Sequence, residues 1–222
     1  KAIKNASLSV VILKEEEVLD YFLNSHKNVQ FVIFYSKDIY LAKYLESLNV
    51  KVFNSSEAIS ICDDKALTYA MLSSNNVNTP KTFVLPYTYG YDLLTKYPHI
   101  DELILSKGFN YPFILKQRVG SFGNEVYLIN NKDELFNKLK EIGNKNLLVQ
   151  EYIKECVGSD YRVNVVGDNA VSIIKRVNNV NFKSNIHQGG HMEKVDDFDE
   201  KILEVAVNAA KACKTTFAGV DI

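Results

Sequence analysis

The sequence predicts an α/β protein built from several small sheets with helices packed on them. Two observations lead to this fold class. The first 53 residues alternate β-rich apolar runs with helical patterns, which is the order of a βαβ unit with a parallel sheet. Further along, pairs of apolar runs are separated by short glycine-containing segments, which is typical of hairpins. The 222 residues suffice for one large domain or for two to three small ones.

The N-terminal region is expected to hold three strands and two helices. The apolar runs predict strands over residues 8–13, 29–35 and 50–53. Helical patterns lie between them at residues 15–24 and 38–48. The buried face of the second helix is predicted to consist of Ile39, Ala42, Leu45 and Leu48.

The next predicted helix follows a loop over residues 54–62 and begins near Asp63 or Asp64, either of which is suited to cap it. Lys65 falls in its first turn, where a cation opposes the helix macrodipole by a few tenths of a kcal/mol. An anionic ligand bound at this end of the helix would make the position of Lys65 favourable instead of unfavourable. The alternative is an exposed lysine neutralised by the two aspartates. The buried face is predicted to consist of Leu67, Ala70 and Met71.

The middle of the chain is expected to form strands over residues 81–85, 112–118 and 126–129. Residues 87–110 form a polar, aromatic insertion with a helical stretch around 100–105, to which the sequence assigns no chemistry. The glycine-containing segment 120–124 is compatible with a plain hairpin turn. In isolation the hairpin turn is favoured. The alternative is a flap whose N–H groups close over phosphates while Lys116 reaches in from the strand, although the segment lacks the Walker spacing.

The last third is expected to contain a helix over residues 132–141, a strand over 146–150 and a hairpin around Gly167. A helix from Asp199 carries one apolar stripe that includes Cys213, so this thiol is expected in the core. A final strand over residues 217–222 holds Asp221.

The composition is that of a water-soluble globular protein. With 27 acidic and 26 basic residues, the net charge of −1 provides no general attraction to nucleic acid or to a membrane surface. No apolar run approaches the ~18–20 residues of a membrane span, and no signal-peptide pattern is present. We therefore expect a cytoplasmic protein, for which the sequence leaves a homo-oligomer open.

Cysteine and arginine are used sparingly. Cys62, Cys156 and Cys213 are far apart and match no metal-ligand spacing, so reduced, buried thiols are expected. Three of the 26 basic residues are arginine. Each arginine is expected to form a planar two-pronged contact to phosphate or carboxylate. The alternative is that each forms a surface ion pair. The arginines are Arg118, Arg162 and Arg176.

Residues 150–190 combine carboxylates, cations, amides and an imidazole in a short stretch. Carboxylates suit a sugar hydroxyl or an exocyclic amine, and cations suit phosphate oxygens, so the stretch predicts a nucleotide site beside a second substrate. His187 and His191 have the four-residue spacing of helical metal ligands, but Gly189 and Gly190 between them argue against a helix and hence against zinc. The favoured alternative is that His187 faces a substrate.

With these residues in hand, the chain resembles the ATP-grasp superfamily and, within it, the RimK-like glutamate ligases. The resemblance covers residues 53–222 and consists of eight segments in the family's order: FNSSEAISICDDKAL, NTPKT, PFILKQRVGSFGNEVYLI, LLVQEYI, GSDYRVNVVGD, IIKR, FKSNIHQGG and FAGVDI. The fold it implies is α/β (α+β ATP-grasp), with an N-terminal βαβ domain at residues 1–60. The two ATP-grasp subdomains follow at 61–150 and 151–222.

The resemblance also implies roles for individual residues. Lys65 and Lys116 correspond to lysines that grip the nucleotide phosphates, Gly120, Ser121 and Gly123 to the phosphate flap, and Asp221 to a Mg²⁺ (or Mn²⁺) ligand. Further nucleotide contacts are implied for Gln150, Glu151, Tyr152 and Ile153 at an adenine hinge, and for Asp160, Lys175, Lys183, Ser184 and Asn185. Lysine at position 183, where relatives have arginine, loses a two-pronged contact. Catalytic roles at the transferred phosphate and acyl group are implied for Arg162, Arg176, Asn185 and His187.

The implied activity joins a carboxylate to the amine of an amino acid, glutamate by analogy, through an acylphosphate, with release of ADP and phosphate. The acceptor is a small molecule or a protein tail. Alternatives are another ATP-grasp ligase (glutathione-synthetase-like, lysine-biosynthesis-like or peptide-modifying) and a nucleotide-binding module without catalysis. Relatives carry a further metal-binding Glu and Asn after the aspartate, whereas this sequence ends just beyond Asp221. We therefore expect an incomplete last subdomain with weakened or absent activity.

Overall fold

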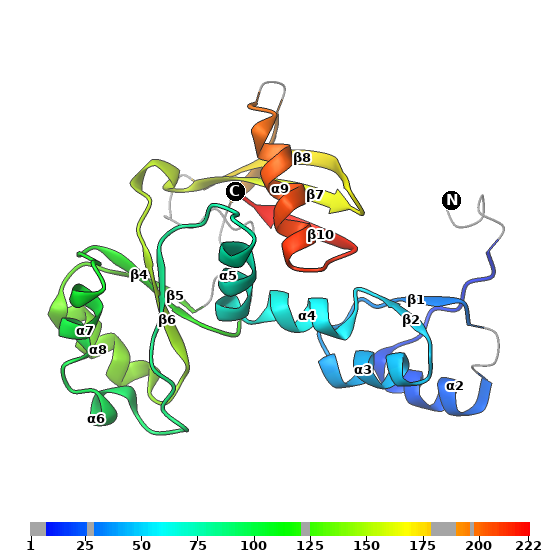
Figure 1. The fold of residues 1–222 in the computed structure, drawn as a ribbon, viewed down its shortest axis with the longest axis horizontal. Helices are drawn as coiled ribbons and strands as arrows, with labels where there is room; N and C mark the ends of the chain where they lie inside the picture. The colour runs from blue at the N-terminus through cyan, green and yellow to red at the C-terminus, as the bar shows by residue number, and fades with distance from the viewer. Residues whose placement is uncertain (1–7, 26–28, 121–124, 179–189, 196–197) are drawn as a thin grey trace.

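The protein is described from a computed structural model that covers residues 8–25, 29–120, 125–178, 190–195 and 198–222. This part of the chain contains a two-stranded parallel sheet and two four-stranded antiparallel sheets. Figure 1 shows the N-terminal sheet apart from the other two, with helix α4 leading from it toward the rest of the molecule.

The N-terminal region consists of η1 (Glu15–Glu17), α2 (Val18–Ser25), β1 (Phe31–Ile33), α3 (Ile39–Ser47) and β2 (Lys51–Phe53). Strands β1 and β2 pair in parallel around α3, so the βαβ prediction is confirmed. Helix α3 begins where the Asp38 side chain accepts a hydrogen bond from the backbone N–H of Leu41. It buries Leu41, Ala42 and Leu45. Ala42 and Leu45 were predicted to be buried, whereas the predicted Ile39 and Leu48 are half-buried.

The prediction of a strand over residues 8–13 is wrong. These residues form no helix or strand, and Val11 and Ile12 are 58% and 91% exposed. A β-rich run becomes a strand only when a neighbour accepts its hydrogen bonds, and the partner assigned to β1 is β2. Leu13 alone of this run packs against the N-terminal core.

Helices α4 (Ser56–Asp63) and α5 (Lys65–Ser74) follow, and α4 replaces the predicted loop. The Ser55 hydroxyl caps α4 by accepting from the N–H of Ala58. Of the two predicted caps, Asp64 is the one that caps α5, by accepting from the N–H of Ala66 at 2.9 Å.

The predicted buried face of α5 is wrong, because Ala66 is buried while Leu67 and Ala70 are exposed. Helix α5 contacts both α4 and α9, and its N-terminal cap forms a β-bridge with Val119, just after strand β4. Because its contacts lie on several sides, a single apolar stripe does not predict which residues are buried.

The central sheet has the order β3 (Thr82–Val84), β6 (Leu147–Glu151), β4 (Phe113–Gln117), β5 (Val126–Ile129). Helices α6 (Leu93–Lys96), α7 (Ile100–Ser106) and α8 (Lys132–Ile142) pack on it. The segment 87–110 is therefore more than a polar insertion: Leu93, Ile100 and Ile104 lie in the same buried cluster as Leu115 and Val149. The helix predicted around residues 100–105 is confirmed.

The C-terminal sheet has the order β10 (Phe217–Asp221), β7 (Ser159–Val166), β8 (Asn169–Val177), β9 (His191–Lys194), and is preceded by η3 (Lys154–Cys156). The predicted hairpin turns at Gly167, whose φ of 57° suits glycine. Helix α9 (Lys201–Ala212) packs on one face of the sheet, against Val163 and Val165. Alternate residues of a strand point to opposite sides, so Asp160, Arg162 and Arg176 lie on the opposite face.

Contacts between distant parts of the sequence join these units. The Asn54 side chain accepts from the N–H groups of Thr216 and Phe217 at 2.7 and 3.2 Å and donates to the carbonyl of Phe217 at 2.8 Å. Lys214 pairs with Glu57 at 2.5 Å. The start of α4 and the start of β10 are thereby fixed to each other.

The cysteine prediction is partly wrong. Cys213 is buried as expected, but Cys62 and Cys156 are exposed. A hydrogen bond between the Cys62 and Cys213 thiols lowers the pKa of Cys62 and raises that of Cys213. The contact arises because the C-terminal ends of α4 and α9 meet.

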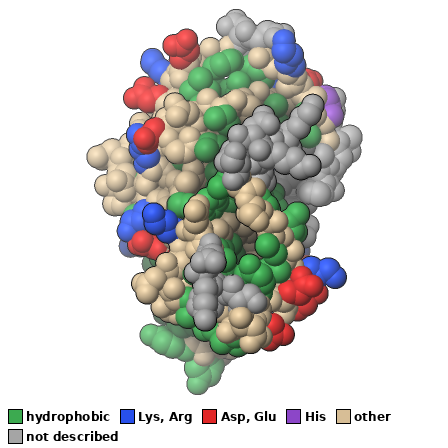
Figure 2. All heavy atoms as spheres, turned by 90° about the vertical axis from the view of Figure 1, so that its right-hand side faces the viewer, with side chains coloured by type: hydrophobic (Ala, Val, Ile, Leu, Met, Phe, Trp, Pro, Cys, Tyr) green, Lys and Arg blue, Asp and Glu red, His purple; other side chains and the backbone are tan. Residues whose placement is uncertain are grey.

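The side of the molecule shown in Figure 2 presents hydrophobic side chains near the middle of the face, with most charged side chains toward its edges. In the described part of the chain, no helix is long and apolar enough to cross a bilayer.

Candidate active site

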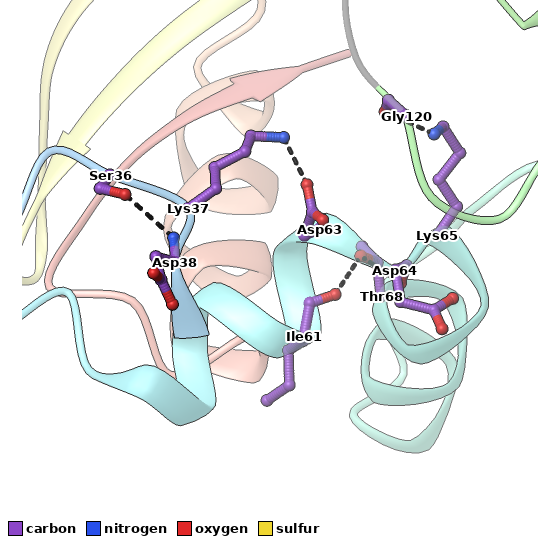
Figure 3. A network of polar contacts seen from close by, with 9 residues as sticks. All are labelled: Ser36, Lys37, Asp38, Ile61, Asp63, Asp64, Lys65, Thr68 and Gly120. Carbon is purple, nitrogen blue, oxygen red and sulfur yellow. Dashed lines mark hydrogen bonds and ion pairs between the residues drawn. The ribbon is translucent and has the colours of Figure 1, made fainter. Parts of the chain in front are cut away.

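Two predicted phosphate-binding lysines, Lys65 and Lys116, come together where helix α5 meets strand β4. The Lys65 ammonium group donates to the Gly120 carbonyl at 2.8 Å (Figure 3). The backbone N–H of Lys65 donates to the Arg118 carbonyl at 2.9 Å. Asp64 and Val119 form a β-bridge beside these bonds. The first turn of α5 is therefore held against the end of the strand that carries Lys116.

Burial makes the charged form of both lysines unfavourable. Burial, and secondly the charge of Lys65, lowers the pKa of Lys116 to about 8. Burial also lowers the pKa of Lys65, and the nearby charge of Lys37 adds to this effect, whereas Asp63 and Glu125 oppose it. A polyanion placed between the two ammonium groups would remove their repulsion, so the pair is suited to phosphate.

Gln150 orients Lys116 from the neighbouring strand β6. Its side-chain oxygen accepts from the Lys116 ammonium group at 2.5 Å, and its side-chain nitrogen donates to the Thr82 hydroxyl at 2.9 Å. The hydrogen bonds fix both the amide and the lysine, because the donor and acceptor ends of Gln150 are each occupied.

Lys37 lies near this pair and was missed by the sequence analysis. It reaches from the loop before α3 to Asp63 at the end of α4, as Figure 3 shows. Its charge acts on Lys65. No sequence signal could have identified it, because it stands in a loop of the N-terminal region and its partner is distant in the chain.

Arg118 makes the two-pronged carboxylate contact that its rarity predicts. Its guanidinium group donates to both oxygens of Asp64, with Nε at 3.2 Å from Oδ1. These hydrogen bonds and the nearby charge raise the pKa of Arg118. Burial raises the pKa of Asp64, but the bonds from Arg118 and from the N–H of Ala66 outweigh it and lower that pKa below its ordinary value. Arg118 thus secures the N-terminal cap of α5.

A second group of charges lies on the polar face of the C-terminal sheet. It comprises Asp160 and Arg162 on β7, Arg176 on β8 and Asp221 on β10, and we call it the acid–arginine group. Strand pairing brings these residues together, because Asp160 is opposite Arg176 and Arg162 is opposite Asp221.

The contacts within the acid–arginine group are short and unequal. Arg176 binds Asp160 with two parallel bonds of 2.7 and 2.5 Å, and it also lies 2.9 Å from Oδ1 of Asp221. Arg162 donates to the same Asp221 oxygen at 2.5 Å. Hydrogen bonding to Asp160 is the main cause of a raised pKa at Arg176, whose side chain is 11% exposed. Arg176 is thus a fixed cation, whereas Arg162 and Asp221 are more accessible, at 35% and 48%.

The predicted adenine-hinge residues lie at the end of β6. The Glu151 side chain accepts from the N–H of Lys81 at 2.5 Å, and its own N–H donates to the Lys81 carbonyl at 2.9 Å. Tyr152 is half-buried and Ile153 is 36% exposed at the start of η3. Glu151 and Tyr152 help to line a pocket of about 270 Å³ together with Lys81, Phe109 and Tyr111. The segment from Glu151 to Ser159 connects the central and C-terminal sheets.

Other predicted site residues are placed in part. Lys175 lies on β8 opposite Tyr161 of β7. Ser121, Gly123, Lys183, Ser184, Asn185 and His187 lie outside the described residues, so the flap and the loop after β8 stay predictions. His191 lies on β9, where its ring is 3.0 Å from Glu193.

Comparison with known proteins identifies the family of this chain. A profile of the RimK-like ATP-grasp domain matches residues 62–222. The chain is 30% identical over 194 residues to "Uncharacterized protein MG012 homolog" of Mycoplasma pneumoniae, an alignment that covers 86% of this chain and 66% of that protein. It is 36% identical over 186 residues to a "Probable alpha-L-glutamate ligase" of Parasynechococcus marenigrum, covering 82% of this chain and 37% of that protein.

Solved structures show the same fold. The D-alanine–D-alanine ligase of Bacillus anthracis in complex with ATP superposes with a TM-score of 0.70 at 19% identity, over 97% of this chain and 70% of that one. An ATP-grasp RimK domain protein of Sphaerobacter thermophilus superposes with a TM-score of 0.62 at 17% identity, over 96% and 83%. The predicted fold class is therefore confirmed, and the chain belongs to the RimK-like ATP-grasp family.

Proposed function

We propose that the chain is the catalytic part of an ATP-dependent carboxylate–amine ligase that joins an amino acid, glutamate in the first instance, to a carboxylate acceptor. The observation that carries this proposal is the pairing of Lys65 and Lys116 in a partly buried position, with a lowered pKa at both ammonium groups. The name of the Parasynechococcus relative supports glutamate as the amine. The chain spans 66% and 37% of the two curated relatives described above, so the activity of the whole protein belongs to this proposal.

The chemistry requires two steps. A carboxylate oxygen attacks the γ-phosphorus of ATP, and ADP leaves. The amine then attacks the acyl carbon, inorganic phosphate leaves, and the amine nitrogen loses a proton. The carboxylate is a poor electrophile until phosphorylation removes its charge and provides a leaving group. The protein's contribution is to position the two reactants and neutralise developing charge.

The described residues divide this work between the two sheets. Lys65 and Lys116 bind phosphate oxygens from the central-sheet side, and Gln150 keeps the Lys116 ammonium group in place. Arg162 and Arg176 provide positive charge on the C-terminal sheet, where Asp160 holds Arg176 with two hydrogen bonds. Adenine is expected at the Glu151–Ile153 hinge that links the sheets.

A divalent cation is implied by the family, and the residues fit one that arrives with the nucleotide. Among the described residues, no group of three or more His, Cys, Asp or Glu side chains could hold a metal ion. Asp221 offers one accessible carboxylate, and Mg²⁺ is commonly bound by one or two carboxylates together with substrate phosphates. When bound, such an ion would neutralise phosphate charge and polarise the transferred phosphoryl group.

Trapping of the acylphosphate tests the function directly. Protein, ATP and Mg²⁺ are incubated with candidate carboxylic acids and hydroxylamine, and hydroxamate and ADP are measured. Formation of both in a carboxylate-dependent manner supports the ligase. Calorimetric binding of ADP without either product would favour the nucleotide-binding module, and an absence of both binding and turnover in folded protein would refute the proposal.

The amine is tested separately, by replacing hydroxylamine with glutamate and then with other amino acids. Mass spectrometry of the products would identify the amide. An amide formed with another amino acid and not with glutamate would favour a different ATP-grasp ligase.

A further inference from the structure

The carboxylate of Asp221, the proposed metal ligand, already contacts two positively charged side chains. Its Oδ1 atom accepts from Arg162 at 2.5 Å and lies 2.9 Å from the Arg176 guanidinium group. A free divalent cation approaching this oxygen meets two guanidinium groups. Charge repulsion at such distances is strong enough to oppose binding even near a protein surface.

The two arginines are not equally able to leave. Arg176 is bound to Asp160 by two bonds and is 11% exposed, so moving it would leave Asp160 without this pair of bonds. The ion pair assigned to Arg162 is that with Asp221, and its side chain is 35% exposed. Of the two, Arg162 is the one that can turn toward a ligand at lower cost.

Gly219 provides the place where the Arg162 guanidinium group lies. It stands on β10 two residues before Asp221, on the same side of the strand. A methyl group built on Gly219 would overlap Nε, Cζ and Nη2 of Arg162. The guanidinium group therefore occupies the space that a side chain at Gly219 would fill, while its remaining nitrogen, Nη1, donates to Asp221.

We propose that Arg162, seated on Gly219, is an exchangeable counter-ion of Asp221. In the absence of nucleotide it neutralises the carboxylate and excludes free divalent cations. When a nucleotide binds, its phosphates attract Arg162 away, and Asp221 becomes available to the cation that the phosphates bring. This inference rests on the proposed function and adds an order of binding: the cation enters with the nucleotide or after it. Gly219 is a positioning residue, because it gives the Arg162 side chain the space it needs.

Cation binding without nucleotide tests the proposal. Free Mn²⁺ is measured by electron paramagnetic resonance during titration of the wild-type chain and of Arg162→Met, Gly219→Ala and Ser172→Ala. Ser172 lies on the same sheet, where it accepts from Asn164, and serves as the matched control. We expect weak binding by the wild type and the control, about tenfold tighter binding by Arg162→Met, and a smaller gain in Gly219→Ala.

Nucleotide binding provides a second readout, in which Arg162→Met is expected to lower affinity and not to raise it. In metal-free buffer, Arg162→Met should bind ADP several-fold more weakly than the wild type, because the cation that moves to the phosphates is gone. A purely structural role of Arg162 would weaken both Mn²⁺ and ADP binding. Circular dichroism and thermal unfolding of each variant establish that it is folded.

The outcomes separate the inference from the function beneath it. Equal Mn²⁺ affinity in Arg162→Met and the wild type would overturn the counter-ion role, even if ADP binds normally. Wild-type Mn²⁺ affinity in a folded Gly219→Ala would overturn the seating role of the glycine. If the wild type binds no ADP with or without Mn²⁺, the proposed nucleotide site itself is wrong.

Discussion

Lys116 is the residue whose environment departs most clearly from that of an ordinary lysine in the proposed site. Its pKa of about 8, caused by burial and by the charge of Lys65, means that the folded protein holds this proton less firmly than the unfolded chain does. The unfolded chain binds more protons between pH 8 and the ordinary lysine pKa of 10.5, so the stability contributed by this group rises across that window. Below pH 8 the charged lysine is a cost to folding, and in the proposed function its charge binds phosphate.

Replacing Lys116 by methionine should therefore separate stability from binding. At pH 7 we expect the free energy of unfolding to rise by about 1–2 kcal/mol, because a desolvated charge is removed while its hydrogen bond to Gln150 is lost. ADP binding should fall at least tenfold. Lys140→Met on the exposed side of α8 is the control. Urea denaturation and calorimetry measure the two effects, and unchanged ADP affinity would remove Lys116 from the site.

The same residue predicts the pH dependence of binding. Phosphate favours the charged lysine, so ADP binding should take up a proton above pH 8, and the dissociation constant should rise by up to tenfold per pH unit there. The Lys116→Met variant should lose this dependence. Calorimetry in buffers of different ionisation enthalpy detects the proton, and an identical pH profile in both proteins would contradict the assignment.

Arg118 and Asp64 give a prediction about stability alone. In Arg118→Met the carboxylate of Asp64, with 15% of its side chain exposed, loses both bonds, and unfolding should become easier by about 1–3 kcal/mol. The pKa of Asp64 is lowered, so its contribution is present above its ordinary pKa of 3.8 and is lost as the pH falls through the folded value. The exposed pair Lys211–Asp168 provides the control, Lys211→Ala, with almost no expected change. Equal urea midpoints for Arg118→Met and Lys211→Ala would contradict this prediction.

Helix α8 shows how an element is held in place by its apolar stripe. Leu135 and Leu139 are 0% and 1% exposed and pack into the core of the central sheet, and Asn131 caps the helix by accepting from the N–H of Glu134. Sequence periodicity identifies such a helix well, because both its cap and its stripe are local. Strands β4 and β6, which carry Lys116 and Gln150, rest on this layer.

Truncation of Leu139 to alanine should lower the free energy of unfolding by about 2–5 kcal/mol, through lost burial and the cavity left behind. Lys140→Ala, one residue further on the exposed side, should change it by less than about 0.5 kcal/mol. Chemical denaturation of both variants measures the difference. A loss below about 1 kcal/mol for Leu139→Ala would mean that α8 does not pack as described.

Asn54 joins the N-terminal region to β10 and so connects distant units of the protein. Because its amide satisfies two backbone N–H groups at the start of that strand, Asn54→Ala should cost about 1–3 kcal/mol of unfolding free energy. Displacement of β10 should also weaken ADP binding in the presence of Mg²⁺, since the strand carries Gly219 and Asp221. Asn75→Ala is the matched control, because that amide bonds within its own helix and to Ser74. Wild-type stability and binding in Asn54→Ala would show that the joint is dispensable.

Four predictions that depended on local signals were confirmed by the structure, whereas the local β-rich pattern of residues 8–13 and the apolar pattern of α5 gave wrong predictions. The βαβ order, the Asp64 cap, the hairpin at Gly167 and the buried Cys213 each follow from neighbouring residues in the chain. The family followed from motifs in register. The limits of the three predicted domains and the roles of the site residues stay predictions.

Turn residues, caps and apolar periodicity act over a few positions, so the order of most strands and helices, the family and the residue types available for chemistry could be read from the chain alone. Three-dimensional packing was needed to show that residues 8–13 lack a strand partner and that Lys37 lies near Lys65. It was needed again to show that Arg118 binds Asp64 while Arg162 rests on Gly219 and holds Asp221. Each of these facts depends on which segments, distant in the sequence, become neighbours in the fold. Strand pairing and helix packing determine these neighbours, and no local sequence pattern encodes them.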